Sequence, residues 1–163
     1  EQQLLTNRLD AALVEGRVRS RDLLATPVIR DCLLLICRQD SAFAGRAGVP
    51  LAEIAVAPLL LRERGSDTRA ALDRVFEERG LRAQVAWECN NTQAILNAVR
   101  QGFGVALLSP CLLRGQGEGL AAVPVSDCDF TRWFSVAVHR DKFIGERLRA
   151  FLDLCAQWQP EDP

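Results

Sequence analysis

A series of short apolar runs, each of strand length, constrains the fold of this chain most strongly. Two of them read "CLLLIC" at Cys32–Cys37 and "GVALLS" at Gly104–Ser109, and charged or turn residues bound each one. The others are Leu9–Val14, Pro58–Arg62, Ala83–Glu88, Leu120–Val125 and Trp133–His139. Such runs are typical of strands that are covered on both faces, as in parallel sheets. Because helical patterns lie between several of them, the sequence predicts an α/β fold.

Amphipathic helices are predicted where apolar residues recur at helical spacing. The clearest predicted helices cover 66–79, 92–101 and 143–158. Gly80 and Gly102 end the first two of them, and Asn90 or Asn91 supplies a cap for the second.

Charge and composition narrow the range of functions. The chain has 163 residues and a formal net charge of −1, with no block of Lys or Arg. Because non-specific DNA binding depends on neutralising phosphates, this chain is a poor candidate for holding DNA by itself. No apolar run is long enough to cross a bilayer, and the start does not resemble a secretory signal.

The residues with reactive side chains form no catalytic or metal-binding pattern. The six cysteines include no C-x-x-C pair, and most lie in apolar runs, which indicates a reduced cytoplasmic protein. The one histidine, His139, ends a predicted strand without a nucleophile motif to serve. We therefore expect no enzyme activity, no metal and no cofactor.

Polar residues open two of the predicted helices directly after strands. Ser66–Thr68 follows "PLLLR", and Asn90–Thr92 follows "QVAWEC". In an open α/β sheet, such positions bring hydroxyls and helix N–H groups to the edge where ligands bind. The alternative is that Ser66 and Asn90 or Asn91 only cap their helices. The sequence leaves both interpretations open.

Longer segments add a resemblance to a known family. The runs "PLLLRERGSDTRAALDRVF", "WECNNTQAILNAVRQGFGVALLS" and "FSVAVHRDKF" resemble, in this order, the regulatory domain of LysR-type transcriptional regulators. The resemblance implies a two-lobed fold of the periplasmic-binding-protein type 2 class, with two crossover strands near Ala57–Arg62 and Trp133–Arg140. It implies lobe I at 1–57 and 139–163, and lobe II at 58–138.

Two departures from the family pattern are visible. Asp67 stands where the family commonly has Gly between the Ser and Thr of the G-S-x-T-R turn. The family's regulatory domain also opens with a further strand, helix and strand before the position of Glu1, and a winged helix-turn-helix comes before that. The resemblance implies that DNA is bound only through that missing domain, and that the intact protein is a homo-oligomer.

The expected function is effector sensing, with the effector bound between the lobes. We expect lobe I to contribute Glu15 and Gly16, which follow the strand Leu9–Val14. The expected contacts from lobe II are Ser66, Thr68, Asn90, Asn91 and Thr92. A polar ligand with a carboxylate or carbonyl group suits this set, whereas Asp67 and Glu15 argue against a highly charged anion.

Two other functions stay open from the sequence. The chain could belong to a solute-binding protein of a transporter, which would need a signal peptide or lipid anchor upstream. It could also be an oxidation sensor that uses Cys89, although no resolving cysteine lies nearby in the sequence.

Overall fold

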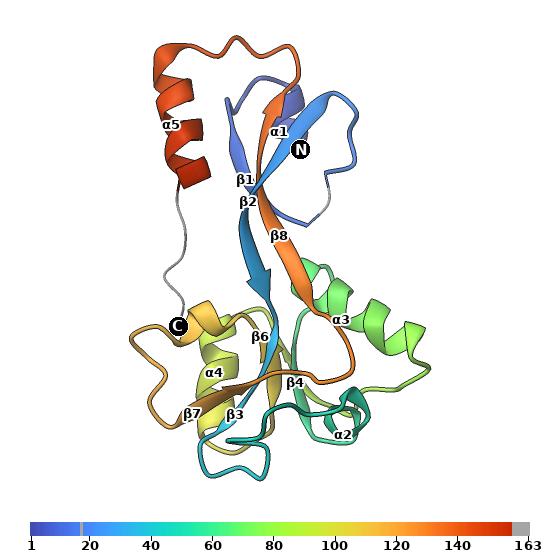
Figure 1. Cartoon of the computed structure of the whole chain (residues 1–163). Coiled ribbons are helices and arrows are strands. Elements are labelled where there is room, and N and C mark those ends of the chain that lie inside the picture. The colour runs from blue at the N-terminus through green and yellow to red at the C-terminus, as the bar shows by residue number, and fades with distance from the viewer. Residues whose placement is uncertain (17, 158–163) are drawn as a thin grey trace. The chain divides into compact units, whose positions relative to one another are not determined.

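The chain folds into two compact units, each of which is described by itself. The structure, a computed structural model, describes residues 1–16 and 18–157. The central unit is Cys32–Phe130, and the terminal unit comprises Glu1–Asp31 and the described chain from Thr131 onwards. The chain therefore enters the central unit after Asp31 and leaves it after Phe130 (Figure 1).

The central unit contains a mixed set of strands with helices against them. Its strands are β3 (Leu34–Arg38), β4 (Leu59–Arg62), β5 (Val85–Cys89), β6 (Ala106–Leu108) and β7 (Leu120–Val123). Its helices are α2 (Leu51–Ala55), α3 (Asp67–Glu78), α4 (Thr92–Arg100) and the 3-10 turn η1 (Pro110–Leu113). β3 lies between β6 and β7 and is antiparallel to both, while β4 and β5 are parallel.

Strand β4 needs an uninterrupted apolar run because both of its faces are buried. Successive side chains of a strand point to opposite faces. Leu59 and Leu61 pack into one buried cluster, which also holds Leu72, Val75 and Phe76 of α3. Leu60 packs into a second cluster, with Ile95, Leu96 and Val99 of α4. Helices thus cover both faces of β4, and each fully buried leucine contributes about 1.5–3 kcal/mol.

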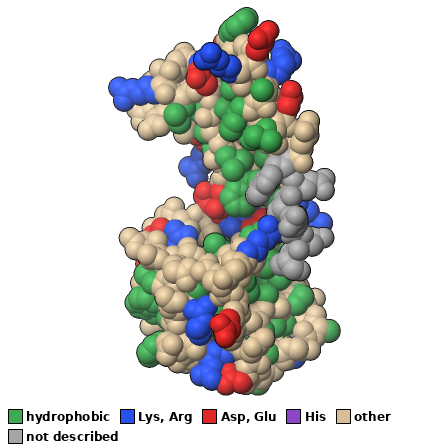
Figure 2. Space-filling view, turned by 90° about the vertical axis from the view of Figure 1, so that its left-hand side faces the viewer, with side chains coloured by type: hydrophobic (Ala, Val, Ile, Leu, Met, Phe, Trp, Pro, Cys, Tyr) green, Lys and Arg blue, Asp and Glu red, His purple; other side chains and the backbone are tan. Residues whose placement is uncertain are grey.

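The terminal unit has a smaller core. Its strands β1 (Ala12–Glu15), β8 (Thr131–His139) and β2 (Leu23–Cys32) form a sheet in that order, with β1 antiparallel to β8. The helices are α1 (Gln2–Leu5) and α5 (Glu146–Gln157). The buried cluster of this unit consists of Leu4, Leu23 and Ala137. Apolar side chains also gather on its surface (Figure 2).

The structure bears out the predicted segments and corrects their pairing. Each predicted strand run overlaps an observed strand, although β2 was not predicted, and the helices expected at 66–79 and 92–101 are α3 and α4. The third helix starts at Glu146 rather than at Phe143, and Trp158 lies outside the described residues. Parallel pairing is found between β4 and β5, whereas β3 pairs antiparallel with both of its neighbours.

The predicted lobe bounds at 58 and 138 differ from the observed units. Residues 32–57 belong to the central unit, because β3 pairs with β6 and β7 and because α2 packs into the same core. Residues 131–138 belong to the terminal unit, because β8 pairs with β1. The chain passes between the units after Asp31 and after Phe130. The second predicted crossover, Trp133–Arg140, overlaps β8, which begins at Thr131, whereas the first, Ala57–Arg62, lies inside the central unit.

A close backbone approach connects β4 to the chain before β6. Val105 N–H donates to the Pro58 carbonyl oxygen at 2.9 Å, and Leu60 N–H donates to the Val105 carbonyl oxygen at 2.9 Å. A Cβ atom added at Gly104 would lie 2.2 Å from that Pro58 oxygen. Only glycine fits there, which accounts for the glycine ahead of the "VALLS" run.

We expect Gly104→Ala to lower the free energy of unfolding by about 3 kcal/mol, because backbone atoms must move to admit the methyl group. Gly45→Ala is the control, since Gly45 has a positive φ of 75° but nothing within 4 Å of an added Cβ. The control should lose only about 1 kcal/mol. Urea denaturation of both variants tests this, and equal losses would show that the close approach costs nothing extra.

Candidate functional site

The parallel strands β4 and β5 end side by side. Their register pairs Leu61 with Glu88 and Arg62 with Cys89, so both chains leave the sheet at the same edge. Each strand leads through a short loop into a helix, α3 after β4 and α4 after β5. The carboxyl ends of parallel strands are where open α/β sheets bind ligands. We call this place the β4–β5 edge.

The loop after β4 exposes a serine that does not cap its helix. Gly65 adopts a φ of 101°, which favours glycine and turns the chain into α3. Ser66 is the N-cap residue of α3, and its carbonyl oxygen accepts from Ala70 N–H at 2.9 Å. Its hydroxyl makes no capping hydrogen bond. The half-buried Ser66 side chain is therefore not used as a cap, while Thr68 is buried.

The loop after β5 behaves differently. Asn91 is the N-cap of α4, and its Oδ1 accepts from Ala94 N–H at 3.1 Å. Asn91 N–H lies 3.4 Å from the Cys89 sulfur, which accepts its hydrogen. Asn90 is exposed, and the half-buried Thr92 is the first residue of the helix. Asn91 is thus committed to capping.

Arg62 joins the two loops. Its Nε and Nη2 donate to the Glu63 carboxylate at 2.8 and 3.0 Å, and its Nη1 donates to the Thr92 hydroxyl oxygen at 3.1 Å. The Arg62 guanidinium holds the pKa of Glu63 below its usual range. Glu63 is therefore ionised at neutral pH.

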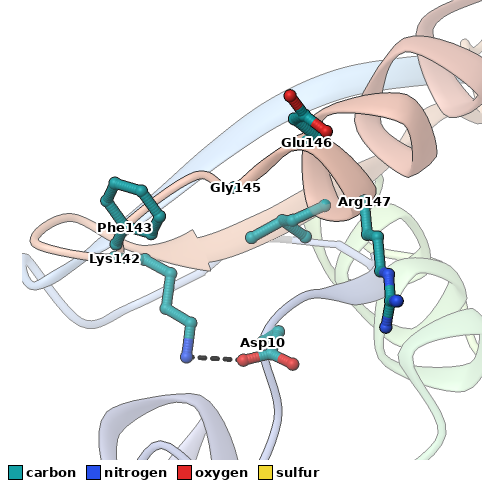
Figure 3. Close-up of a pocket in the computed structure, with 7 residues that line it drawn as sticks. Asp10, Lys142, Phe143, Gly145, Glu146 and Arg147 are labelled. Carbon is teal, nitrogen blue, oxygen red and sulfur yellow. Dashed lines mark ion pairs between the residues drawn. The ribbon is translucent and has the colours of Figure 1, made fainter.

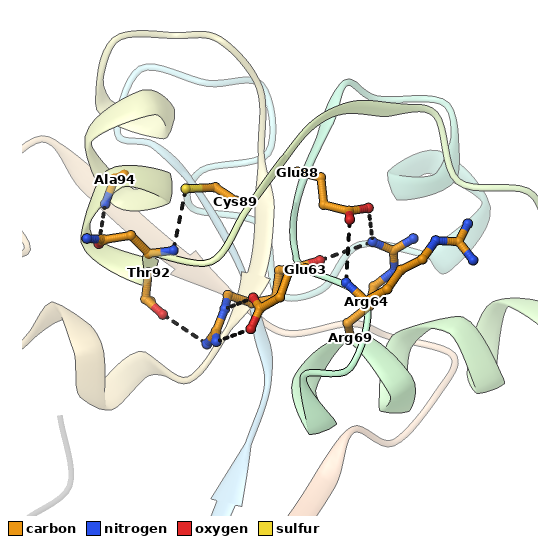
Figure 4. A network of polar contacts seen from close by, with 9 residues as sticks. Glu63, Arg64, Arg69, Glu88, Cys89, Thr92 and Ala94 are labelled. Carbon is orange, nitrogen blue, oxygen red and sulfur yellow. Dashed lines mark hydrogen bonds and ion pairs between the residues drawn. The ribbon is translucent and has the colours of Figure 1, made fainter.

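A buried arginine, Arg69, forms hydrogen bonds to residues of both strand ends (Figure 4). Arg69 of α3 is 5% exposed, and its Nη1 donates to the Arg62 carbonyl oxygen at 3.0 Å and to Glu88 Oε2 at 2.7 Å. Its Nε donates to Asp73 Oδ1 at 2.8 Å. The hydrogen bond from Arg69 lowers the pKa of Glu88. Arg69 therefore ties α3 to the ends of both β4 and β5.

The structure brings the five residues predicted from lobe II to the β4–β5 edge. Glu15 and Gly16 lie in the terminal unit, at the end of β1. Arg132 of β8 forms a salt bridge with the Glu15 carboxylate, and its Nε donates to Asp31 Oδ2 at 2.7 Å. Gly16 N–H donates to the Trp133 carbonyl oxygen at 3.4 Å. The negative charge of Glu15 is therefore compensated inside its own unit.

Sequence reasoning missed the charged residues of the edge. Arg62, Glu63, Arg69 and Glu88 are all in the quoted segments, but their contacts join positions up to thirty residues apart. The (i, i+4) spacing of Arg69 and Asp73 was a local signal of an ion pair at this edge.

Two hollows lie elsewhere. One, of about 650 Å³, is in the terminal unit, where Lys142 Nζ lies 2.6 Å from Asp10 Oδ1 (Figure 3). The other, of about 510 Å³, is in the central unit and is lined by Leu60, Ala86, Trp87, Ala98 and Phe103. Neither contains the polar residues of the β4–β5 edge. We base the candidate site on the edge, because its side chains supply directed hydrogen-bonding groups.

Apart from Cys89, the cysteines do not form part of the candidate site. All six cysteines are free thiols. Burial raises the pKa of Cys37, and burial together with Asp127 raises the pKa of Cys128 to about 11, so neither thiol is reactive at neutral pH.

Across residues 1–16 and 18–157, no cluster of His, Cys, Asp and Glu could hold a metal ion. No helix in that part of the chain is long and apolar enough to cross a membrane.

Sequence comparison identifies relatives over nearly the whole chain. A family model described as the LysR substrate binding domain matches residues 1–160. YeiE of Escherichia coli K12, an uncharacterized HTH-type transcriptional regulator, is 34% identical over 158 residues, covering 94% of this chain and 53% of YeiE. A RuBisCO operon transcriptional regulator of Allochromatium vinosum is 32% identical over 108 residues, or 66% of this chain and 36% of the relative. The chain spans about half the length of the curated relatives it matches first.

Solved structures share the fold. The regulatory domain of CcmR from Synechocystis PCC6803, in complex with 2-PG, has a TM-score of 0.87 at 24% identity and covers 98% of this chain and 79% of its own. The effector binding domain of QuiR, in complex with shikimate, has a TM-score of 0.82 at 15% identity, with 96% and 74% covered. These likenesses confirm the predicted class, a two-lobed fold of the periplasmic-binding-protein type 2 class.

We expect alanine substitutions at Asn91 and at Ser66 to lower the free energy of unfolding by different amounts. Asn91→Ala removes a capping bond and should lower the free energy of unfolding by about 1 kcal/mol. Ser66→Ala removes no capping bond and should cost less than half as much. Asn91→Ser, which keeps a capping oxygen, should recover most of the loss. Thermal and urea unfolding of the variants decide between the two roles, and equal losses at Ser66 and Asn91 would identify Ser66 as a cap.

Proposed function

The chain belongs to the LysR substrate-binding domain family, and from this membership we propose that it senses a small polar effector for a longer transcriptional regulator. The proposal rests mainly on Ser66, whose hydroxyl lies at the β4–β5 edge and makes no capping hydrogen bond. Around it are the exposed Asn90 and the hydroxyl of Thr92. Hydroxyl and amide groups in such a position bind polar ligands through directed hydrogen bonds.

Two solved structures of the same fold support a small-molecule ligand. The CcmR regulatory domain was solved in complex with 2-PG and the QuiR effector binding domain in complex with shikimate. We propose that this chain takes a polar effector with a carboxylate or carbonyl group, bound by Ser66, Thr68, Asn90 and Thr92. Asn91 contributes by fixing the loop, because its side chain is occupied by the cap.

We propose that the two units are the two lobes of the domain, with Glu15 and Gly16 as the contribution of the terminal unit to the effector site. An effector that touches both lobes favours one lobe arrangement over another, and shifts the equilibrium by no more than its difference in affinity. In the longer protein this shift would reach a DNA-binding domain that lies outside the chain. We further propose that this protein is a homo-oligomer and acts in the cytoplasm.

The named relatives favour a regulator over the alternatives. They are transcriptional regulators and not enzymes. The same relatives argue against a solute-binding protein of a transporter. We accordingly propose no catalytic role for the chain.

We expect Ser66→Ala to weaken effector binding by roughly threefold to a hundredfold. Losing one hydrogen bond costs about 0.5–1.5 kcal/mol, or up to ~3 kcal/mol when a charged group loses its partner. The measurement is isothermal titration calorimetry of the complete regulator with a panel of small carboxylates and phosphate esters that includes shikimate and 2-PG.

Two controls accompany this titration. Asn97→Ala changes an exposed position of α4 away from the helix start and should leave the affinity within about twofold. The melting temperature of each variant separates loss of binding from loss of folding. A ligand that binds the regulator with unchanged affinity after both Ser66→Ala and Asn90→Ala would remove the β4–β5 edge from the effector site.

A further inference from the structure

Arg62 is placed to recognise an anion at the β4–β5 edge. It is the last residue of β4, and its side chain is 24% exposed. Its Nε and Nη2 donate in parallel to the two oxygens of Glu63, at 2.8 and 3.0 Å. This two-pronged arrangement is the one in which arginine binds carboxylate and phosphate groups. The Glu63 carboxylate therefore marks where an anionic oxygen group fits against Arg62.

Glu63 is the partner of this pair that can be exchanged. Its side chain is 36% exposed, so water solvates the carboxylate when it leaves the guanidinium. An incoming anion that replaces Glu63 on Arg62 breaks one bidentate contact and forms an equivalent one. Exchange of one carboxylate for another therefore has a small energetic cost.

Thr92 adds a second donor beside the guanidinium. Its oxygen accepts from Arg62 Nη1 at 3.1 Å. A hydroxyl has one proton to donate and two lone pairs, so this contact leaves its proton for an acceptor. A ligand oxygen next to Arg62 and Thr92 would thus receive hydrogen bonds from both.

The other arginines of the loop have different surroundings. Arg69 is buried against Glu88, Asp73 and the Arg62 carbonyl oxygen, so it holds the loops together. The Arg64 side chain is exposed, and its backbone N–H contacts Glu88 Oε1 at 3.4 Å. The negative charges of Glu15 and Asp67 repel an anion only weakly. Arg132 compensates Glu15, and Asp67 is exposed to solvent.

We propose that Arg62 and Thr92 bind an anionic oxygen group of the effector, a carboxylate or a phosphate, and that Glu63 is the internal carboxylate which this group displaces. The inference rests on the proposed function and adds the charge class of the effector. It makes Arg62 the residue that determines specificity at this edge.

The test uses inorganic phosphate and acetate as probes, titrated separately into the full 163-residue chain at constant ionic strength. Nuclear magnetic resonance follows the Arg62 Nε–H and the Thr92 amide signals and gives a dissociation constant. We expect saturable shifts of both signals with one of the two probes, which identifies phosphate or carboxylate as the preferred group.

Variants then assign the contacts. Glu63→Gln removes the competing charge and should tighten probe binding by about tenfold, which corresponds to about 1.4 kcal/mol. Arg62→Gln should abolish the saturable shift at Thr92. Arg64→Gln is the matched control, since it removes an exposed arginine two residues away, and it should change the dissociation constant by less than twofold.

Three results would overturn the inference. Unchanged probe binding after Arg62→Gln would indicate an adventitious ion only. Unchanged binding after Glu63→Gln would show that Glu63 does not compete. No saturable shift with either probe, even in Glu63→Gln, would also exclude an anion at Arg62. In each case an effector whose affinity falls with Ser66→Ala would still uphold the proposed function, so the two failures are distinguishable.

Discussion

The buried guanidinium of Arg69 is the contact on which the β4–β5 edge depends. Strand pairing brings Arg62 and Cys89 to the same level, and the bond from Arg62 to Thr92 joins the loops that follow. Arg69 adds a buried tie, since it reaches the Arg62 carbonyl oxygen and the Glu88 carboxylate from the first turn of α3. A buried charge is stable only when it is paired and hydrogen-bonded, so this position tolerates little variation.

The local spacing of apolar residues predicts the helices and strands of this chain. The bounds of the two units and the contacts of the β4–β5 edge depend on residues that are distant in sequence. The run "PLLLR" and the stripe on α3 were recognisable because apolar spacing is a local property. The bounds of the two units were not, because they follow from β3 pairing with β6 and β7, about seventy and eighty-five residues later in the chain. The same limit explains why the bond from Arg62 to Thr92 escaped sequence reasoning.

The structure also separates two roles that look identical in the sequence. Ser66 and Asn91 both open helices after strands, and either could be a cap or a ligand contact. Asn91 uses its side chain on Ala94 N–H, whereas the Ser66 hydroxyl makes no such bond. The difference depends on side-chain rotation at the helix start, which residue identity alone does not determine. A binding role for Ser66 is accordingly favoured over a binding role for Asn91.

We propose that Arg69 holds the β4–β5 edge in the form that binds an effector. Amide hydrogen exchange in Arg69→Lys tests it most directly, because lysine keeps the charge but loses the planar fork. The amides of Ser66 and Ala70 should exchange faster than in the parent chain, while those of Leu60 and Val105 should keep their protection. Unchanged exchange at Ser66 and Ala70, or an equal increase at all four amides, would show that Arg69 does not hold this edge.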